Sequence, residues 1–114
     1  MKTKSDRLLS IQPRLRIRLG SEIALGPGKA ELLRLVRETR SISEAARQMK
    51  MSYMRAWSLI QTMNGCFRQP VIRTTRGGQA RGGASLTPTG ERLLNLYQRL
   101  ESEFLMASKG TLQK

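Results

Sequence analysis

One predicted helix, beginning after Ser52 and ending near Met63, carries the side chains best suited to contacting a polymer. Successive residues of a helix are about 100° apart, and this spacing places five residues on the outer face: Met54, Arg55, Ser58, Gln61 and Thr62. This face has one cation and three hydrogen-bonding side chains but no carboxylate. Short donors and acceptors of this kind suit the edges of nucleic-acid bases and the oxygens of phosphates. The alternative is an ordinary helical hairpin with a weakly charged, solvated surface.

The groups that enzymes use for acid–base or metal chemistry are missing. There is no histidine, the single Cys66 has no base partner, and Glu44 is the only carboxylate between Thr39 and Gly90. This composition supplies neither a general acid–base pair there nor a set of imidazole or thiolate metal ligands. We therefore expect a protein that is not an enzyme and that holds no metal or cofactor.

The charge of the chain implies an anionic partner. Lys and Arg number 21 against 8 Asp and Glu, a net charge of +13 over 114 residues. Seven cations and one carboxylate lie between Ser43 and Ser85, whereas two arginines and three glutamates lie between Thr87 and Ala107. Nucleic acid, a membrane surface and an acidic protein are the partner classes this allows. Because the sequence has no long apolar run and no signal peptide, we expect a cytoplasmic protein without membrane contact.

Two short amphipathic segments predict a helix-turn-helix. Apolar positions of the first follow helical spacing, with Ser43 at the expected N-cap and Ile42, Ala45, Ala46 and Met49 on the buried side. Ser52 is the expected cap of the second helix, whose buried stripe comprises Ala56, Ile60 and Met63, flanked by Tyr53 and Trp57. The small pair Ala45–Ala46 allows the two helices to cross closely.

The segments around this unit predict two more helices and three strands. Strict alternation from Arg14 to Leu19 predicts a half-buried strand, with Leu15, Ile17 and Leu19 inward. A long helix is expected from Lys29 to Thr39, where Leu35 lies off the main apolar stripe, and Asn64–Gly65 is expected to end the second helix of the pair in a left-handed conformation.

A wing is predicted after the helix-turn-helix. Pro70–Thr75 and Ala84–Leu86 are expected as strands, and the loop between them has four glycines together with Arg76, Gln79 and Arg81. These three side chains could lie along a DNA backbone or enter a minor groove. The alternative is a flexible, solvated hairpin loop.

The last helix is expected to begin after the N-cap Thr87 and to reach about Ala107. A helix that long overhangs a small domain, so we expect a homodimer formed through one apolar stripe, namely Leu93, Leu96, Tyr97, Leu100 and Phe104.

Residues 1–12 are expected to be a flexible basic arm, 13–107 the domain with its dimerisation helix at 88–107, and 108–114 a frayed tail. The predicted fold is mainly α with a small antiparallel β wing.

Several short motifs between Lys29 and Phe104 occur together in one known family. They are Ser41-Ile42-Ser43 with Ala45-Ala46, Met51-Ser52-Tyr53 with Ala56-Trp57, Met63-Asn64, Gly77-Gly78, Gly82-Gly83-Ala84, and Leu86-Thr87 with Gly90 and Tyr97. With these, the sequence resembles the N-terminal DNA-binding domain of the ModE-type molybdate-responsive regulators, a winged-helix group related to the LysR-type helix-turn-helix.

The resemblance implies a dimeric transcriptional regulator, a repressor or an activator, that binds a palindromic operator in double-stranded DNA. Molybdate sensing in that family belongs to a separate C-terminal region, so no molybdate site is expected in this chain. Expected DNA contacts are Ser43, Ser52, Tyr53, Met54, Arg55, Ser58, Gln61 and Thr62 on the helices, with Arg76, Gln79 and Arg81 on the wing. The competing hypothesis is a winged-helix module that docks an acidic protein.

Overall fold

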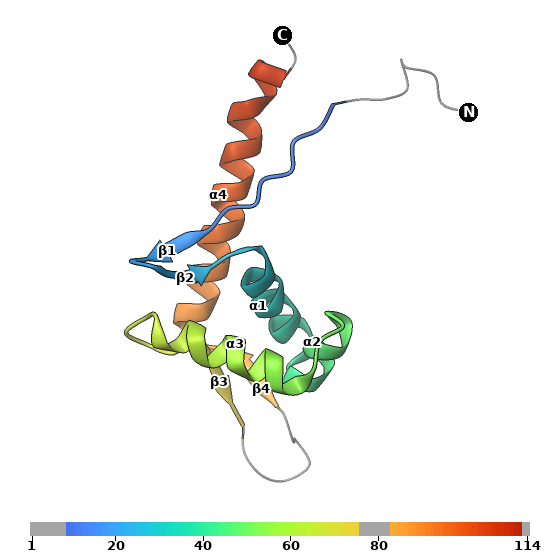
Figure 1. The fold of residues 1–114 in the computed structure, drawn as a ribbon, viewed down its shortest axis with the longest axis vertical. Coiled ribbons are helices and arrows are strands. Elements are labelled where there is room, and N and C mark those ends of the chain that lie inside the picture. Colours follow the sequence, from blue (N-terminus) through green and yellow to red (C-terminus); the bar gives the residue numbers. More distant parts are fainter. Residues whose placement is uncertain (1–8, 76–82, 113–114) are drawn as a thin grey trace, which may run out of the picture.

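In the part of the chain that the structure describes, the protein has four helices and two small antiparallel sheets (Figure 1). A computed structural model describes residues 9–75 and 83–112. In chain order the elements are β1 (Ile17–Leu19), β2 (Glu22–Leu25), α1 (Pro27–Thr39), α2 (Ile42–Gln48), α3 (Tyr53–Gly65), β3 (Ile72–Thr74), β4 (Ala84–Leu86) and α4 (Pro88–Leu112). This arrangement confirms the predicted fold class, a mainly helical winged helix-turn-helix.

Helix α1 is the central element of the core. It contacts α2, α3 and α4 as well as β2 and β4. Because it has neighbours on more than one side, it buries Leu35 in addition to the main stripe of Leu32, Leu33 and Val36. The off-stripe position of Leu35 in the sequence therefore marked a helix that is packed on two sides.

The first sheet is a hairpin of β1 and β2, and only part of it was predicted. Leu15 and Ile17 pack against the core as expected, but Leu19 is 58% exposed. The chain reverses at Gly20, whose φ is +59°, so Leu19 lies at the turn of the hairpin, opposite Glu22. The returning strand β2, which the sequence did not predict, instead buries Ala24 and Leu25.

The second sheet forms the stem of the wing. β3 and β4 pair from Ile72 opposite Leu86 to Thr74 opposite Ala84. The stem is also fixed to the connection between α1 and α2, because Ala84 N donates to Arg40 O at 3.1 Å and Ser41 forms a β-bridge with Gly83. The predicted wing contacts Arg76, Gln79 and Arg81 lie outside the described residues.

Helix α3 ends where predicted but without the predicted left-handed conformation at Asn64 or Gly65. It stops at Gly65, yet the C-cap Cys66 has a right-handed conformation with φ −85°. The side chain of Asn64 instead joins this end of the helix to the start of β3. Its Oδ1 accepts hydrogen bonds from Val71 N at 2.8 Å and Ile72 N at 3.3 Å, and its Nδ2 donates to Ile72 O at 3.3 Å.

Helix α4 begins at a tight junction with the segment just before β3. Thr87 Oγ1 caps the helix by accepting from Gly90 N at 3.0 Å, and it donates to Pro70 O at 2.6 Å. Thr87 N also donates to Val71 O at 3.1 Å. The helix then continues to Leu112, past its expected end at Ala107.

Two residues expected at a dimer interface belong to the monomer core instead. Tyr97 is 1% exposed and Leu93 is 8% exposed. The Tyr97 hydroxyl donates to Leu15 O at 2.8 Å and so joins α4 to the N-terminal segment. Burial and the nearby Glu101 raise the pKa of Tyr97, so the hydroxyl retains the proton it donates. The expectation of an interface role for Leu93 and Tyr97 was wrong, because the helix-period pattern does not distinguish core burial from contact with a partner.

Candidate nucleic-acid interface

Helix α3 presents the predicted polar face to solvent. Ser52 caps the helix, with its Oγ accepting from Arg55 N at 3.1 Å, as expected. The side of α3 that packs against the core buries Ala56, Ile60 and Met63 completely. The opposite side exposes Tyr53, Met54, Arg55, Ser58 and Gln61, and Met54 reaches 70% exposure.

The polar groups of this face are largely free to bind a partner. Within the described residues, the Arg55 guanidinium forms no ion pair with a carboxylate. Thr62 is half-buried, and its hydroxyl donates to Ser58 O at 3.1 Å, so Thr62 offers a partner only its oxygen lone pairs. The exposed face of α3 is thus one free cation among neutral donors and acceptors.

The turn between α2 and α3 adds a cation that the predicted contacts did not include. Lys50 has the left-handed conformation with φ +57°, and it is exposed. Its N–H donates to Arg47 O and the N–H of Met51 donates to Ala46 O, both at 3.0 Å, which is the Schellman pattern of helix termination. A basic residue between two helices of a predicted helix-turn-helix is the sequence signal that could have identified it.

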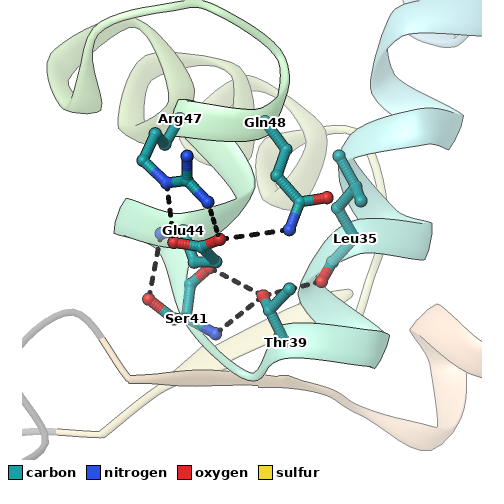
Figure 2. A network of polar contacts seen from close by, with 6 residues as sticks. All are labelled: Leu35, Thr39, Ser41, Glu44, Arg47 and Gln48. Carbon is teal, nitrogen blue, oxygen red and sulfur yellow. Dashed lines mark hydrogen bonds and ion pairs between the residues drawn. The ribbon is translucent and has the colours of Figure 1, made fainter.

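The N-terminus of α2 differs from the prediction. Ser41, not Ser43, is the N-cap, because Ser41 Oγ accepts from Glu44 N at 3.1 Å (Figure 2). Ser41 adopts the extended conformation that a cap requires, and this lets the helix begin at Ile42. Ser43 is an exposed residue of the first turn and remains available as a contact.

Three charged and polar side chains of α2 bind one another, as Figure 2 shows. Glu44 Oε2 accepts from Arg47 Nε at 3.0 Å, and Glu44 Oε1 accepts from the Arg47 terminal nitrogen and from Gln48 Nε2, the latter at 3.2 Å. Hydrogen bonds from Arg47, and secondly from Gln48, lower the pKa of Glu44 to about 2. The carboxylate and guanidinium of α2 therefore neutralise each other.

The stem of the wing supplies another exposed cation. Arg73 lies on β3 between the buried Ile72 and the half-buried Thr74, and it forms no ion pair with any described residue. The sequence-based prediction placed its wing contacts further along, in the loop, and omitted Arg73. Its side chain faces solvent because successive residues of a strand point to opposite faces.

A second surface, on α4 from Leu96 onward, exposes several large apolar side chains. With 25 residues the helix is about 37 Å long, and its end rises beyond the body formed by α1, α2 and α3 (Figure 1). The large apolar side chains exposed there are Leu96, Leu100, Phe104, Leu105 and Met106. Leu96, Leu100 and Phe104 are the members of the predicted dimer stripe that remain accessible.

One cavity lies apart from the polar face of α3. It has a volume of about 420 Å³ and opens between the segment from Ile11 to Arg14, the start of α1 and the middle of α4. Its lining includes Arg34, Tyr97 and Glu101 but no residue of α3. Across residues 9–75 and 83–112, no group of three or more His, Cys, Asp or Glu side chains is arranged to hold a metal ion.

Comparison with known proteins relates most of the chain to one group of regulators and binding proteins. It is 37% identical over 87 residues to the transcriptional regulator ModE of Haemophilus influenzae, covering 76% of this chain and 34% of that protein. It is 34% identical over 86 residues to the DNA-binding transcriptional dual regulator ModE of Escherichia coli, covering 75% of this chain and 33% of that protein. The molybdenum-pterin-binding protein MopB of Rhodobacter capsulatus is 42% identical over 78 residues, which cover 68% of this chain and 29% of MopB.

The chain spans about a third of the length of these relatives. In the ModE proteins the matched part is the N-terminal region. The names of these relatives describe regulators and binding proteins, not enzymes. No protein-family model matches the chain. Among the described helices, none is both long enough and apolar enough to cross a membrane.

Proposed function

We propose, from the homology of about three quarters of this chain to the N-terminal region of the ModE transcriptional regulators, that it binds double-stranded DNA sequence-specifically and regulates transcription in the cytoplasm. The observation that carries the proposal is the exposed face of α3. This face has a free guanidinium, several neutral hydrogen-bonding groups and no carboxylate. An α-helix with such a face fits the major groove, where base edges display donors and acceptors.

In this proposal α3 reads bases, and the residues around it contact phosphates. Arg55, Ser58 and Thr62 are the candidates for base or phosphate contact, with Ser52 and Tyr53 at the N-terminal end of the helix. Lys50 and Arg73 flank α3 on the turn and on the wing stem, where cations position a duplex without reading its sequence. Arg76, Gln79 and Arg81 remain proposed contacts from the sequence.

We further propose that two copies associate through the exposed part of the α4 stripe, Leu96, Leu100 and Phe104. Three large apolar side chains on one exposed helix are a typical site of association between copies. A two-fold dimer would bind two half-sites about one helical turn, or a multiple of it, apart.

DNA reading by α3 is tested with two arginine variants of equal charge. After selection of a preferred sequence from a random duplex library, Arg55→Ala should weaken binding to that sequence by roughly 5- to 150-fold, the range for loss of one base contact. Binding to random DNA should weaken less. Arg92→Ala, which removes an exposed arginine from α4, is the matched control and should leave the preference unchanged.

Equal losses from both variants on both DNAs would show that α3 does not read bases. The competing hypothesis, a module for an acidic protein, makes a different prediction. If the library yields no preferred sequence, and polyglutamate at matched charge displaces a bound duplex as well as random duplex does, that hypothesis replaces DNA recognition.

The dimer is tested by placing charge on α4. Leu100→Glu should convert the dimer to monomers, because a buried unpaired carboxylate costs several kcal/mol. Asn95→Glu puts the same charge on an exposed polar position of α4 and should leave the dimer intact. Light scattering reports both results. A monomeric parent protein, or a dimer unaffected by Leu100→Glu, would refute this interface.

Binding of a molybdenum compound is a second candidate function, favoured by the 42% identity to a protein named as molybdenum-pterin-binding. A specific site would raise stability by about RT ln(1 + [L]/Kd). Thermal unfolding with molybdate, compared with sulfate at equal ionic strength, tests for an oxyanion site. We expect no difference; a rise with molybdate alone would establish a site in this chain.

A further inference from the structure

The start of α2 has the sequence of a capping box but only half of its hydrogen bonds. Ser41 and Glu44 occupy the N-cap and N3 positions, and Ser41 Oγ accepts from Glu44 N as the motif requires. In a complete capping box the N3 carboxylate accepts from the N–H of the cap. Here Ser41 N donates to Thr39 Oγ1 at 3.2 Å instead, and Thr39 Oγ1 donates to Leu35 O at 2.8 Å (Figure 2).

Because Thr39 takes this bond, the Glu44 carboxylate is left to face other partners. It binds Arg47 through both oxygens and Gln48 through one. The Arg47 side chain is 72% exposed and that of Glu44 is 37% exposed. An ion pair this exposed adds little to the stability of the fold, but its three hydrogen bonds keep the carboxylate between Arg47 and Gln48.

The pair lies at a place where its charge matters for the proposed function. Glu44 is the only carboxylate between Thr39 and Gly90, the stretch that contains α2, α3 and the wing. Ser41, one turn away, is bridged to Gly83 at the wing stem, and α2 packs directly against α3. A free cation on α2 would therefore border the surface proposed to meet DNA.

We propose that Glu44 is a positioning residue that holds Arg47, and with it Gln48, away from the DNA backbone. Arg47 and Gln48 then add no phosphate contact to the binding of any sequence, and Glu44 thereby limits the affinity for DNA that does not depend on sequence. The inference rests on the proposed function. Its physical basis is that each phosphate neutralised by a cation adds about 0.9 to the slope of log affinity against log salt concentration.

The test is Glu44→Gln with a control of identical charge change. Glu103→Gln removes the carboxylate that binds Arg99 at 2.9 Å, in an exposed pair on α4. On random duplex DNA, Glu44→Gln should steepen the salt slope by about 0.9. Between 1 M and 0.1 M salt, the affinity of the variant should therefore rise roughly eightfold more than that of the parent protein. Glu103→Gln should leave the slope unchanged.

A further variant shows whether Arg47 makes the new contact. In the double variant Glu44→Gln/Arg47→Ala the slope should return to that of the parent protein. The fold should survive Glu44→Gln, because the hydrogen bond to Ser41 comes from the backbone N–H and glutamine is also common at N3. An unchanged urea midpoint checks this.

Three results would overturn the inference. They are an unchanged slope for Glu44→Gln, an equal steepening by Glu103→Gln, or a steepening that persists without the Arg47 side chain. Each of these requires a parent protein that binds duplex DNA with a measurable salt slope. A parent that does not bind refutes the proposed function itself, so the two failures are distinct.

Discussion

Replacing Gly90 by alanine should destabilise the protein strongly, because the start of α4 lies against the backbone of the segment before the wing. A Cβ at this position would be 2.1 Å from Val71 O and 3.0 Å from Val71 C, with Leu86 Cβ at 3.4 Å. Real Cβ atoms essentially never approach another atom closer than 3.0 Å. The helix and the Val71 carbonyl must therefore separate by on the order of 1 Å, and close-packed interiors resist such a shift.

The cost follows from what that separation breaks. Overpacking a core costs about 1–3 kcal/mol. Val71 O also accepts the hydrogen bond from Thr87 N at 3.1 Å, and a buried hydrogen bond contributes about 1 kcal/mol. The free energy of unfolding should therefore fall by about 2–4 kcal/mol, a large part of the 5–15 kcal/mol typical of a domain.

Urea unfolding followed by circular dichroism measures this change. With a slope of about 1–3 kcal/mol per M, the midpoint should fall by about 1 M or more. Gly28→Ala is the matched control, since Gly28 also follows a proline in the first turn of a helix but has nothing within 4 Å of an added Cβ. It should raise stability by up to about 1 kcal/mol through helix propensity. A midpoint for Gly90→Ala equal to that of the parent would refute the close approach of α4 to Val71.

Three further predictions concern the turn, the end of α3 and the α2 carboxylate. Lys50→Gly should raise the free energy of unfolding by about 0.5–1 kcal/mol in urea, because glycine relieves the left-handed conformation at φ +57°; a loss of stability would contradict this. Asn64→Ala should cost about 2–3 kcal/mol, because it leaves Val71 N and Ile72 N without their acceptor, whereas Gln61→Ala on the exposed face of α3 should change stability little. The Glu44 carboxyl should titrate by NMR at about 2, and in Arg47→Ala its pKa should move back toward the ordinary 4.5; since the folded pKa is the lower one, the stability from this pair is present above pH 4.5 and is lost as the pH falls through 2.

The candidate site was predictable to the extent that it depends on local pattern. Helical periodicity alone placed Arg55, Ser58 and Gln61 on the exposed face of α3, because a helix fixes the direction of each side chain from its position in the chain. Cap chemistry at Ser52 and Thr87 was likewise readable, since each cap bonds to a residue three positions away. Lys50 and Arg73 also have local signals, a basic residue in the turn and the two-residue alternation of a strand, but the prediction placed its wing contacts in the loop and omitted both.

The sequence by itself determined the helices, their exposed and buried faces, and the basic balance that implies an anionic partner, because these follow from interactions within a few residues. Only the tertiary structure decided which apolar residues of a helix are buried in the core and which remain exposed. The apolar stripe of α4 reads as one continuous seam, but Tyr97 is bonded to Leu15 across 82 positions and belongs to the core, while Leu100 remains exposed. Whether Tyr97 is buried depends on a segment far away in the sequence that packs against α4, and the local sequence around Tyr97 does not contain that information.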